Sequence, residues 1–161
     1  RYPAAFNRFT SASNDAVETD LKNRDIDPWI RSLRNDYDNA VLYEDSLLGK
    51  FLDELQADHV PDFRSFMVVS DHGNEVGHEI DYAGHSPNTK AGYQVPVIMW
   101  YDHIPSTGVD KTRTLNTAEL DNNLMYIMGL KEKSALKRTY WLDDSYQFSP
   151  EENWPYWKHK S

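Results

Sequence analysis

The chain has 161 residues, of which 39% are apolar and 27% charged, a composition typical of globular rather than disordered proteins. Its net charge of −9 argues against general binding to nucleic acid, and the absence of cysteine excludes disulfides and thiolate metal sites. No run of about 18 apolar residues occurs, so the sequence predicts no membrane-spanning helix.

The amino-terminal part predicts an irregular segment followed by one long helix. Residues 1–26 are polar, contain turn formers and show no sustained period, so we expect a surface connection without regular structure. Asp27 can cap a helix, and Pro28 suits a first helical position. Apolar residues then recur every three or four positions, which predicts an amphipathic helix over residues 28–56 that covers one face of a sheet.

Two uninterrupted apolar runs predict the strands of the core. We expect residues 66–70 to form a strand buried on both faces and residues 95–100 to form its neighbour in one sheet. Strands buried in this way are typical of parallel sheets, which need further strands and crossover helices. We therefore expect the chain to be a portion of a larger domain.

The segments around and after these strands are less regular. Residues 73–93 show no convincing helix or strand, and such a long loop in a compact domain is usually functional or disordered. Thr117 suits the cap of a short helix that Gly129 ends. We expect a further short strand at residues 140–142, and we expect the aromatic residues 154–157 to cover apolar surface rather than anchor the chain to a membrane.

The first strand delivers a carboxylate and an imidazole, Asp71 and His72, into a turn at Gly73. Ligands of open α/β sheets are held at the carboxyl ends of strands, and zinc accepts this mixture of oxygen and nitrogen donors. The alternative is an ordinary turn, in which the Asp caps backbone N–H groups and the His is solvated. A catalytic zinc site needs a third protein ligand, for which the loop offers Glu75, His78, Glu79 and His85.

A family resemblance rests on the order and spacing of these motifs. Ser70-Asp-His-Gly73, then His85, then Val95-Pro-Val-Ile-Met-Trp100 resembles the C-terminal half of the catalytic domain of bacterial phosphoethanolamine transferases. These enzymes belong to the alkaline phosphatase and sulfatase superfamily. The family usually has Glu where this chain has Asn74 followed by Glu75.

The remainder of the resemblance lies upstream. Arg1-Tyr-Pro3 resembles the residues that follow the family's His-x-x-Gly-Ser/Thr-His stretch, and Tyr37-Asp-Asn39 resembles part of its long helix. The similarity runs from Arg1 to about Leu130. It implies an α/β fold class, with a partial alkaline-phosphatase-like sheet and covering helices from a larger three-layer α/β/α domain. Within one C-terminal portion of that domain we expect an irregular connection, a core and an extension, at residues 1–26, 27–130 and 131–161.

The resemblance also implies a metal site. Asp71 and His72 would bind Zn²⁺ (one ion of one or two, or another divalent cation), and His85 would contact the phosphate or a second metal. His78 and Glu75 are secondary candidates. The nucleophilic threonine and an opposing acidic ligand would lie upstream, so that neither is in this chain and the chain alone is expected to be inactive.

The implied reaction moves phosphoethanolamine from phosphatidylethanolamine to lipopolysaccharide, on lipid A or the core, through a phosphothreonine intermediate. The full-length protein would lie at the periplasmic face of the inner membrane, attached through a region upstream of a soluble portion. One alternative is a sulfatase or another phosphodiester hydrolase of the superfamily, although sulfatases tend to have Asn in place of His72. The other is a non-catalytic, metal-stabilised interaction domain.

Overall fold

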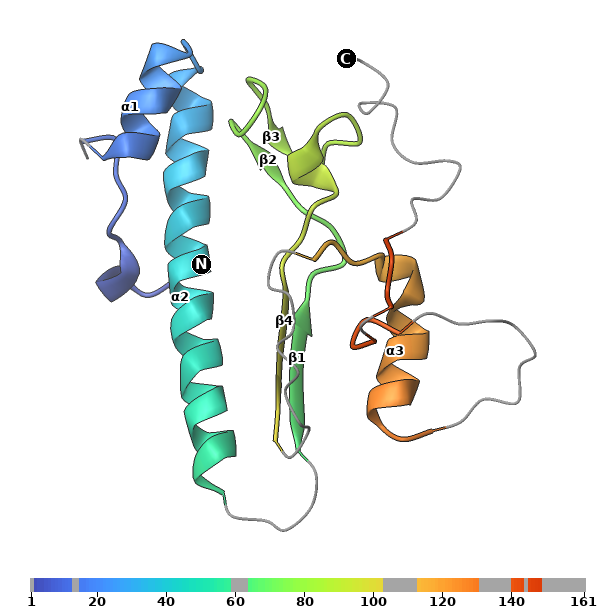
Figure 1. Cartoon of the computed structure of the whole chain (residues 1–161). Helices are drawn as coiled ribbons and strands as arrows, with labels where there is room; N and C mark the ends of the chain where they lie inside the picture. Colours follow the sequence, from blue (N-terminus) through green and yellow to red (C-terminus); the bar gives the residue numbers. More distant parts are fainter. Residues whose placement is uncertain are drawn as a thin grey trace. The chain divides into compact units, whose positions relative to one another are not determined.

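The computed structural model describes residues 2–12, 15–58, 64–102, 113–130, 140–143 and 145–148. The chain divides into two compact units, residues 1–103 with 155–161 and residues 104–154. The first unit contains the long helix and two small antiparallel sheets (Figure 1). Among the described residues, no helix combines the length and the apolar character needed to cross a membrane.

The amino-terminal segment is more regular than predicted. It contains a 3-10 turn, η1 (Ala4–Phe6), and a helix, α1 (Ala16–Asn23). The side chain of Asp15 caps α1 by accepting a 2.8 Å hydrogen bond from the backbone N–H of Glu18. The expectation of an irregular connection is wrong here, because a helix of 8 residues with few apolar positions is too short to show a period.

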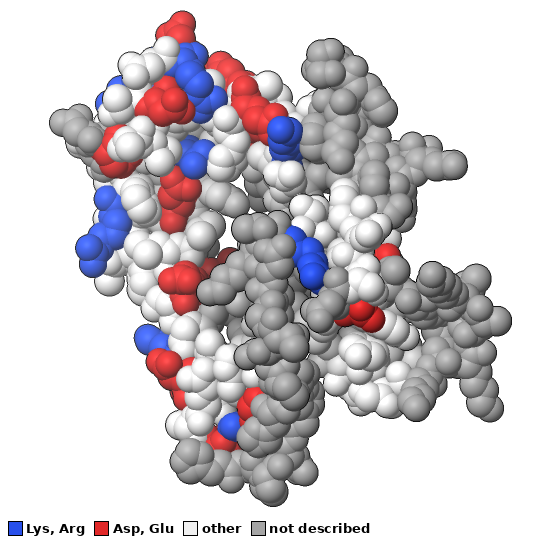
Figure 2. Space-filling view, viewed as in Figure 1, with Lys and Arg blue, Asp and Glu red and all other residues white. Residues whose placement is uncertain are grey.

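The long helix α2 (Pro28–Ala57) confirms the predicted element almost to the residue. Its cap is Asp27, whose side chain accepts a 2.7 Å hydrogen bond from the backbone N–H of Trp29. Acidic and basic side chains are interspersed on the visible face of α1 and α2 (Figure 2). The net negative charge of the chain therefore does not gather into a single-sign patch on that face.

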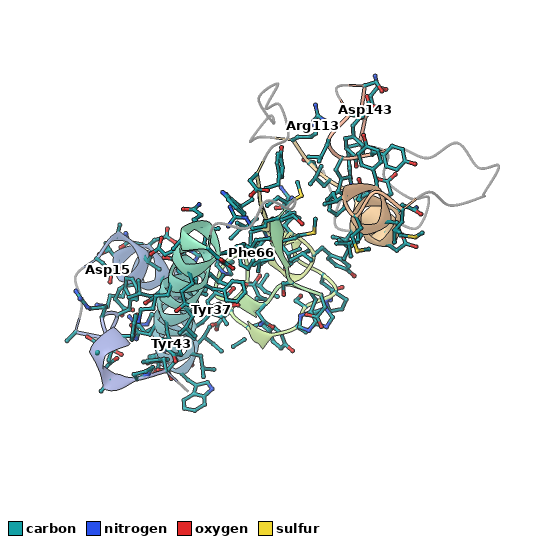
Figure 3. The ribbon with its side chains drawn as sticks, turned by 90° about the horizontal axis from the view of Figure 1, so that it is seen from below. Asp15, Tyr37, Tyr43, Phe66, Arg113 and Asp143 are labelled. Carbon is teal, nitrogen blue, oxygen red and sulfur yellow. The ribbon has the colours of Figure 1, made fainter. Side chains whose placement is uncertain are left out.

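The polar and aromatic residues of α2 hold the neighbouring segments. Asn39 is fully buried, and its Oδ1 accepts hydrogen bonds from the backbone N–H groups of Arg8 and Phe9 at 2.7 and 2.9 Å. Tyr43 packs edge-on against Phe6, with ring centroids 5.0 Å apart. Figure 3 shows Tyr37, Tyr43 and Phe66 on α2 and β1; the rings of the two tyrosines pack against neighbouring rings.

The central sheet consists of β1 (Ser65–Val69) and β4 (Val97–Tyr101), which are hydrogen-bonded neighbours as predicted. They pair antiparallel, with Phe66 opposite Trp100, so the expected parallel arrangement is wrong. Phe66 also contacts Phe51 of α2, with ring centroids 5.3 Å apart. The apolar residues of β1 are half-buried rather than buried on both faces.

The connection between these strands explains the antiparallel pairing. A parallel neighbour needs a crossover, usually a helix. Instead, the chain between β1 and β4 forms a small hairpin of β2 (Glu75–Val76) and β3 (Ala83–Gly84), followed by the 3-10 turn η2 (Lys90–Gly92). The prediction of a structureless loop is therefore wrong, because two-residue strands leave no alternating pattern in the sequence.

The second unit contains η3 (Thr117–Glu119) and α3 (Leu120–Ile127). The predicted short helix is confirmed, and Gly129 follows it with φ +71°. The capping side chain is Asn116 rather than Thr117, and it caps η3, which leads into α3: its side chain accepts a 3.0 Å hydrogen bond from the backbone N–H of Ala118.

The segment after α3 differs from its prediction. Residues 140–142 form a turn rather than a strand, in which Trp141 is buried and its backbone N–H donates a 2.6 Å hydrogen bond to Asn123 Oδ1. Packing of one large ring determines this segment, and a three-residue aromatic run cannot reveal that from sequence. The aromatic residues 154–157 and most of the predicted extension lie outside the described residues.

Candidate metal centre

Asp71 and His72 lie in a tight turn immediately after β1. The Ser70 hydroxyl donates a 2.7 Å hydrogen bond to the backbone carbonyl of His72, and the His72 backbone N–H donates to Asp71 Oδ1 at 3.0 Å. The turn thus uses one carboxylate oxygen of Asp71 and leaves the other, Oδ2, available. Both side chains are exposed.

The orientation of the His72 ring suits a metal ligand. Its Nδ1 lies 3.0 Å from the carbonyl oxygen of Gly73, and a carbonyl can only accept, so Nδ1 carries the proton. The Nε2 atom of the neutral ring then presents its lone pair. A backbone carbonyl bound to the other ring nitrogen is the usual arrangement for metal-binding histidines.

His85 joins this pair although it follows in sequence only after the hairpin. It comes directly after β3, and its ring stacks on that of His72 with centroids 4.4 Å apart and planes inclined by 24°. The structure thereby brings together the three residues that the sequence singles out for the site: Asp71, His72 and His85.

The donor geometry fits one divalent cation. His72 Nε2 and Asp71 Oδ2 are 3.9 Å apart. Zinc binds nitrogen and oxygen at about 2.0–2.2 Å, so two donors of one ion lie within about 4 Å of each other. The Asp71 side chain is 89% exposed and can turn towards His72 without displacing a packed neighbour. Among the described residues no three His, Asp or Glu side chains are grouped to hold a metal, so a complete site requires further ligands.

Glu75, a secondary candidate, occupies a different place. Its side chain is fully buried on β2, and Oε1 accepts a 3.0 Å hydrogen bond from the backbone N–H of Glu79. The Glu79 carboxylate in turn accepts a 3.1 Å hydrogen bond from the backbone N–H of Ala91. These contacts bind the parts of the hairpin and η2 to one another, which gives both carboxylates a role inside the loop.

His78, the other secondary candidate, is held by α2. Its Nδ1 lies 2.9 Å from Arg34 Nη1, and because a guanidinium only donates, Nδ1 must be the accepting, unprotonated nitrogen. Its ring also meets Tyr37 edge-on. Burial, followed by the charge of Arg34, lowers the pKa of His78 below its ordinary value. The role of Arg34 was not predicted; its only signal in the sequence is a cation within the long helix.

Acidification is expected to loosen the contact of His78 with α2. The charged groups that face the ring are Arg34 and Asp38 on α2, Arg24 after α1, and Glu75 on β2. Because the pKa is lowered in the folded state, the unfolded chain takes up the proton first, so the stabilisation is complete above pH 6.5 and is lost as pH falls through the lowered pKa.

Hydrogen exchange of the backbone amides 77–82, corrected for its intrinsic pH dependence, measures this effect. Protection should fall as the pH is lowered below 6.5 in the wild type and much less in His78→Gln, which cannot take up the proton. The same pH dependence in both proteins would assign the titration to another group.

Comparison with known proteins finds similarity to three transferases of Escherichia coli. The chain is 32% identical to the putative transferase YhbX of Escherichia coli K12 over 83 residues, or 50% of the chain. It is 31% identical to the phosphoethanolamine transferase EptA of the same strain over 108 residues, or 62% of the chain. Identity to the phosphoethanolamine transferase EptC of the same strain is 26% over 140 residues, or 81% of the chain. The matches span 15 to 23% of these relatives' lengths.

A family model also matches most of the chain. No solved structure matches the chain significantly. The mixed helices and antiparallel strands of the described residues agree with the predicted α/β class, as part of an alkaline-phosphatase-like fold. The sulfatase profile matches residues 1–128, which is most of the sequence and includes Asp71, His72 and His85. The chain therefore belongs to the sulfatase family.

Proposed function

We propose that the protein containing this chain is a zinc-dependent phosphoethanolamine transferase, with Asp71 and His72 as two of its metal ligands. The observation that carries the proposal is the convergence of His72 Nε2 and Asp71 Oδ2 beside the stacked ring of His85. The relatives EptA and EptC are named phosphoethanolamine transferases, which supports phosphoethanolamine as the transferred group. The proposed donor is phosphatidylethanolamine, and the proposed acceptor is a phosphate or sugar of lipopolysaccharide.

Each residue of the site has a distinct part in this proposal. The Gly73 carbonyl holds the His72 ring by its Nδ1–H, so that Nε2 would remain free to bind the ion. A bound zinc ion would lower the pKa of a nucleophilic hydroxyl and offset the charge of the phosphoryl group. His85, beside the ligands, would contact a phosphate oxygen or a second ion. The nucleophile is proposed to be a threonine outside this chain, at the periplasmic face of the inner membrane.

The test uses the purified full-length protein. It is incubated with phosphatidylethanolamine and lipopolysaccharide, its metal content is measured by elemental analysis, and lipid A and core are examined by mass spectrometry for added phosphoethanolamine. Bound zinc together with this addition would support the proposal. Hydrolysis of an aryl sulfate without transfer would favour a sulfatase instead, and absence of both reactions from a zinc-loaded protein would favour a metal-stabilised interaction domain.

A further inference from the structure

We propose that Arg24 and Arg34 are positioning residues for the candidate metal centre, because they hold the turn of the β2–β3 hairpin on the α1–α2 corner and thereby fix His85 against His72. This inference rests on the proposed function only in its effect on turnover. The structural part concerns the hairpin turn, defined as residues 77–82, and its contacts with α1 and α2.

Arg24, the residue that follows α1, binds the backbone of the turn. Its Nη1 donates to the carbonyl of His78 at 2.9 Å, and its Nη2 donates to the carbonyl of Gly77. Its Nε donates to Asp20 Oδ2 on α1 at 2.9 Å, which fixes the direction of the guanidinium. One side chain thus satisfies two successive carbonyls while its own position is set by the helix.

Arg34 binds the same turn from α2. Its Nη1 donates to the His78 ring, while its Nε lies 2.9 and 3.0 Å from the two carboxylate oxygens of Asp38, one helical turn away. Arg34 and Asp38 are both mostly buried, so this ion pair is shielded from solvent screening better than a surface pair. The guanidinium is therefore fixed before it meets the ring.

Further contacts hold the turn against the two helices. The backbone N–H of Asp27 donates to Asp81 Oδ1 at 2.9 Å. Gly77 has φ +74° and lies so near the helices that a Cβ there would meet Leu21 Cδ2 at 3.1 Å and Ile26 Cγ2 at 3.5 Å. The turn thus packs closely on the α1–α2 corner.

The position of the docked hairpin determines where His85 lies. β2 and β3 share only two residue pairs, and so small a hairpin is not stable in water by itself. Its place is therefore set by docking at its ends. β3 leads directly into His85, whereas Asp71 and His72 belong to the turn after β1, so loss of the docking contacts should move His85 and leave the two ligands in place.

The experiment compares Arg34→Ala, Arg34→Lys and His78→Gln in the full-length protein. Lys50→Ala, which removes an exposed cation from the same helix, is the matched control. Hydrogen exchange of amides 77–86, zinc content and the kcat and KM of transfer are measured for each. In Arg34→Ala, exchange of this segment should rise about 10-fold and kcat should fall about 10- to 100-fold, with zinc content unchanged.

The remaining variants distinguish positioning from general loss of stability. Arg34→Lys keeps the positive charge but loses the planar guanidinium that contacts both Asp38 and His78, so its effect should be intermediate. His78→Gln should share the rise in exchange, and Lys50→Ala should behave as the wild type. Wild-type exchange of residues 77–86 in Arg34→Ala and His78→Gln would overturn the inference, as would raised exchange with unchanged kcat. Should the wild type show no transfer, the proposed function fails, and the exchange of residues 83–86 decides the structural inference alone.

Discussion

Replacing His72 by alanine in the full-length protein is expected to remove zinc and to reduce phosphoethanolamine transfer by at least about 100-fold. The Nε2 lone pair is lost, and it is the only nitrogen donor that the turn after β1 directs towards Asp71 Oδ2. Changes in the residues around metal ligands already cost about 10- to 100-fold, so loss of a ligand should cost more. Zinc content by elemental analysis and transfer by mass spectrometry measure the two effects.

His85→Ala is the informative comparison, because its ring stacks on His72 without belonging to the same turn. We expect this variant to keep the zinc ion proposed at Asp71 and His72 while turnover falls. His78→Ala is a control for zinc content alone, which should be unchanged because its ring is bound to Arg34 rather than directed at Asp71 and His72. Equal loss of zinc in the His72 and His85 variants would instead place both rings on one ion.

The sequence predicts elements whose signal is long or whose chemistry is local. α2 repeats its apolar stripe over 30 residues and begins with an Asp-Pro pair, so its bounds follow from periodicity and capping. The two central strands are evident as apolar runs, but a run of that kind does not encode strand direction. Their antiparallel pairing depends on a connection that lacks a crossover helix, and this connection is built from elements too short to show a pattern.

The residues of the candidate site also differ in how well the sequence predicts them. Asp71 and His72 are adjacent in sequence, so their motif is visible without a structure, and the family resemblance adds His85. Arg24 and Arg34 were missed because their contacts with the hairpin turn join residues 44 to 54 positions apart. Glu75 and His78 follow the proposed ligands in sequence, but Glu75 is buried on β2 and His78 contacts Arg34. Proximity in sequence therefore does not by itself bring a side chain to the proposed site.

The second large effect is expected at Gly73, the residue that follows the two proposed ligands. Its backbone N–H donates to the carbonyl of Gly92 at 3.1 Å, and a Cβ placed on it would lie 1.9 Å from the carbonyl oxygen of Ala91. Because the obstructing atom belongs to the backbone, the turn that follows β1 must move away from η2 in Gly73→Ala. Displacement of about 1 Å at a reacting centre costs about 100-fold in rate, so kcat/KM should fall by that order.

Gly49→Ala is the matched control, because it makes the same chemical change where a new Cβ meets nothing within 4 Å. Gly49 lies inside α2, where alanine favours the helix over glycine by about 0.5–1 kcal/mol, so this variant should be slightly more stable and fully active. Gly92→Ala should cause a similar loss, since its Cβ would lie 1.9 Å from the carbonyl oxygen of Ser86. Wild-type kcat/KM in Gly73→Ala and Gly92→Ala would show that the close contacts of η2 with the turn after β1 and with Ser86 have no part in holding the site.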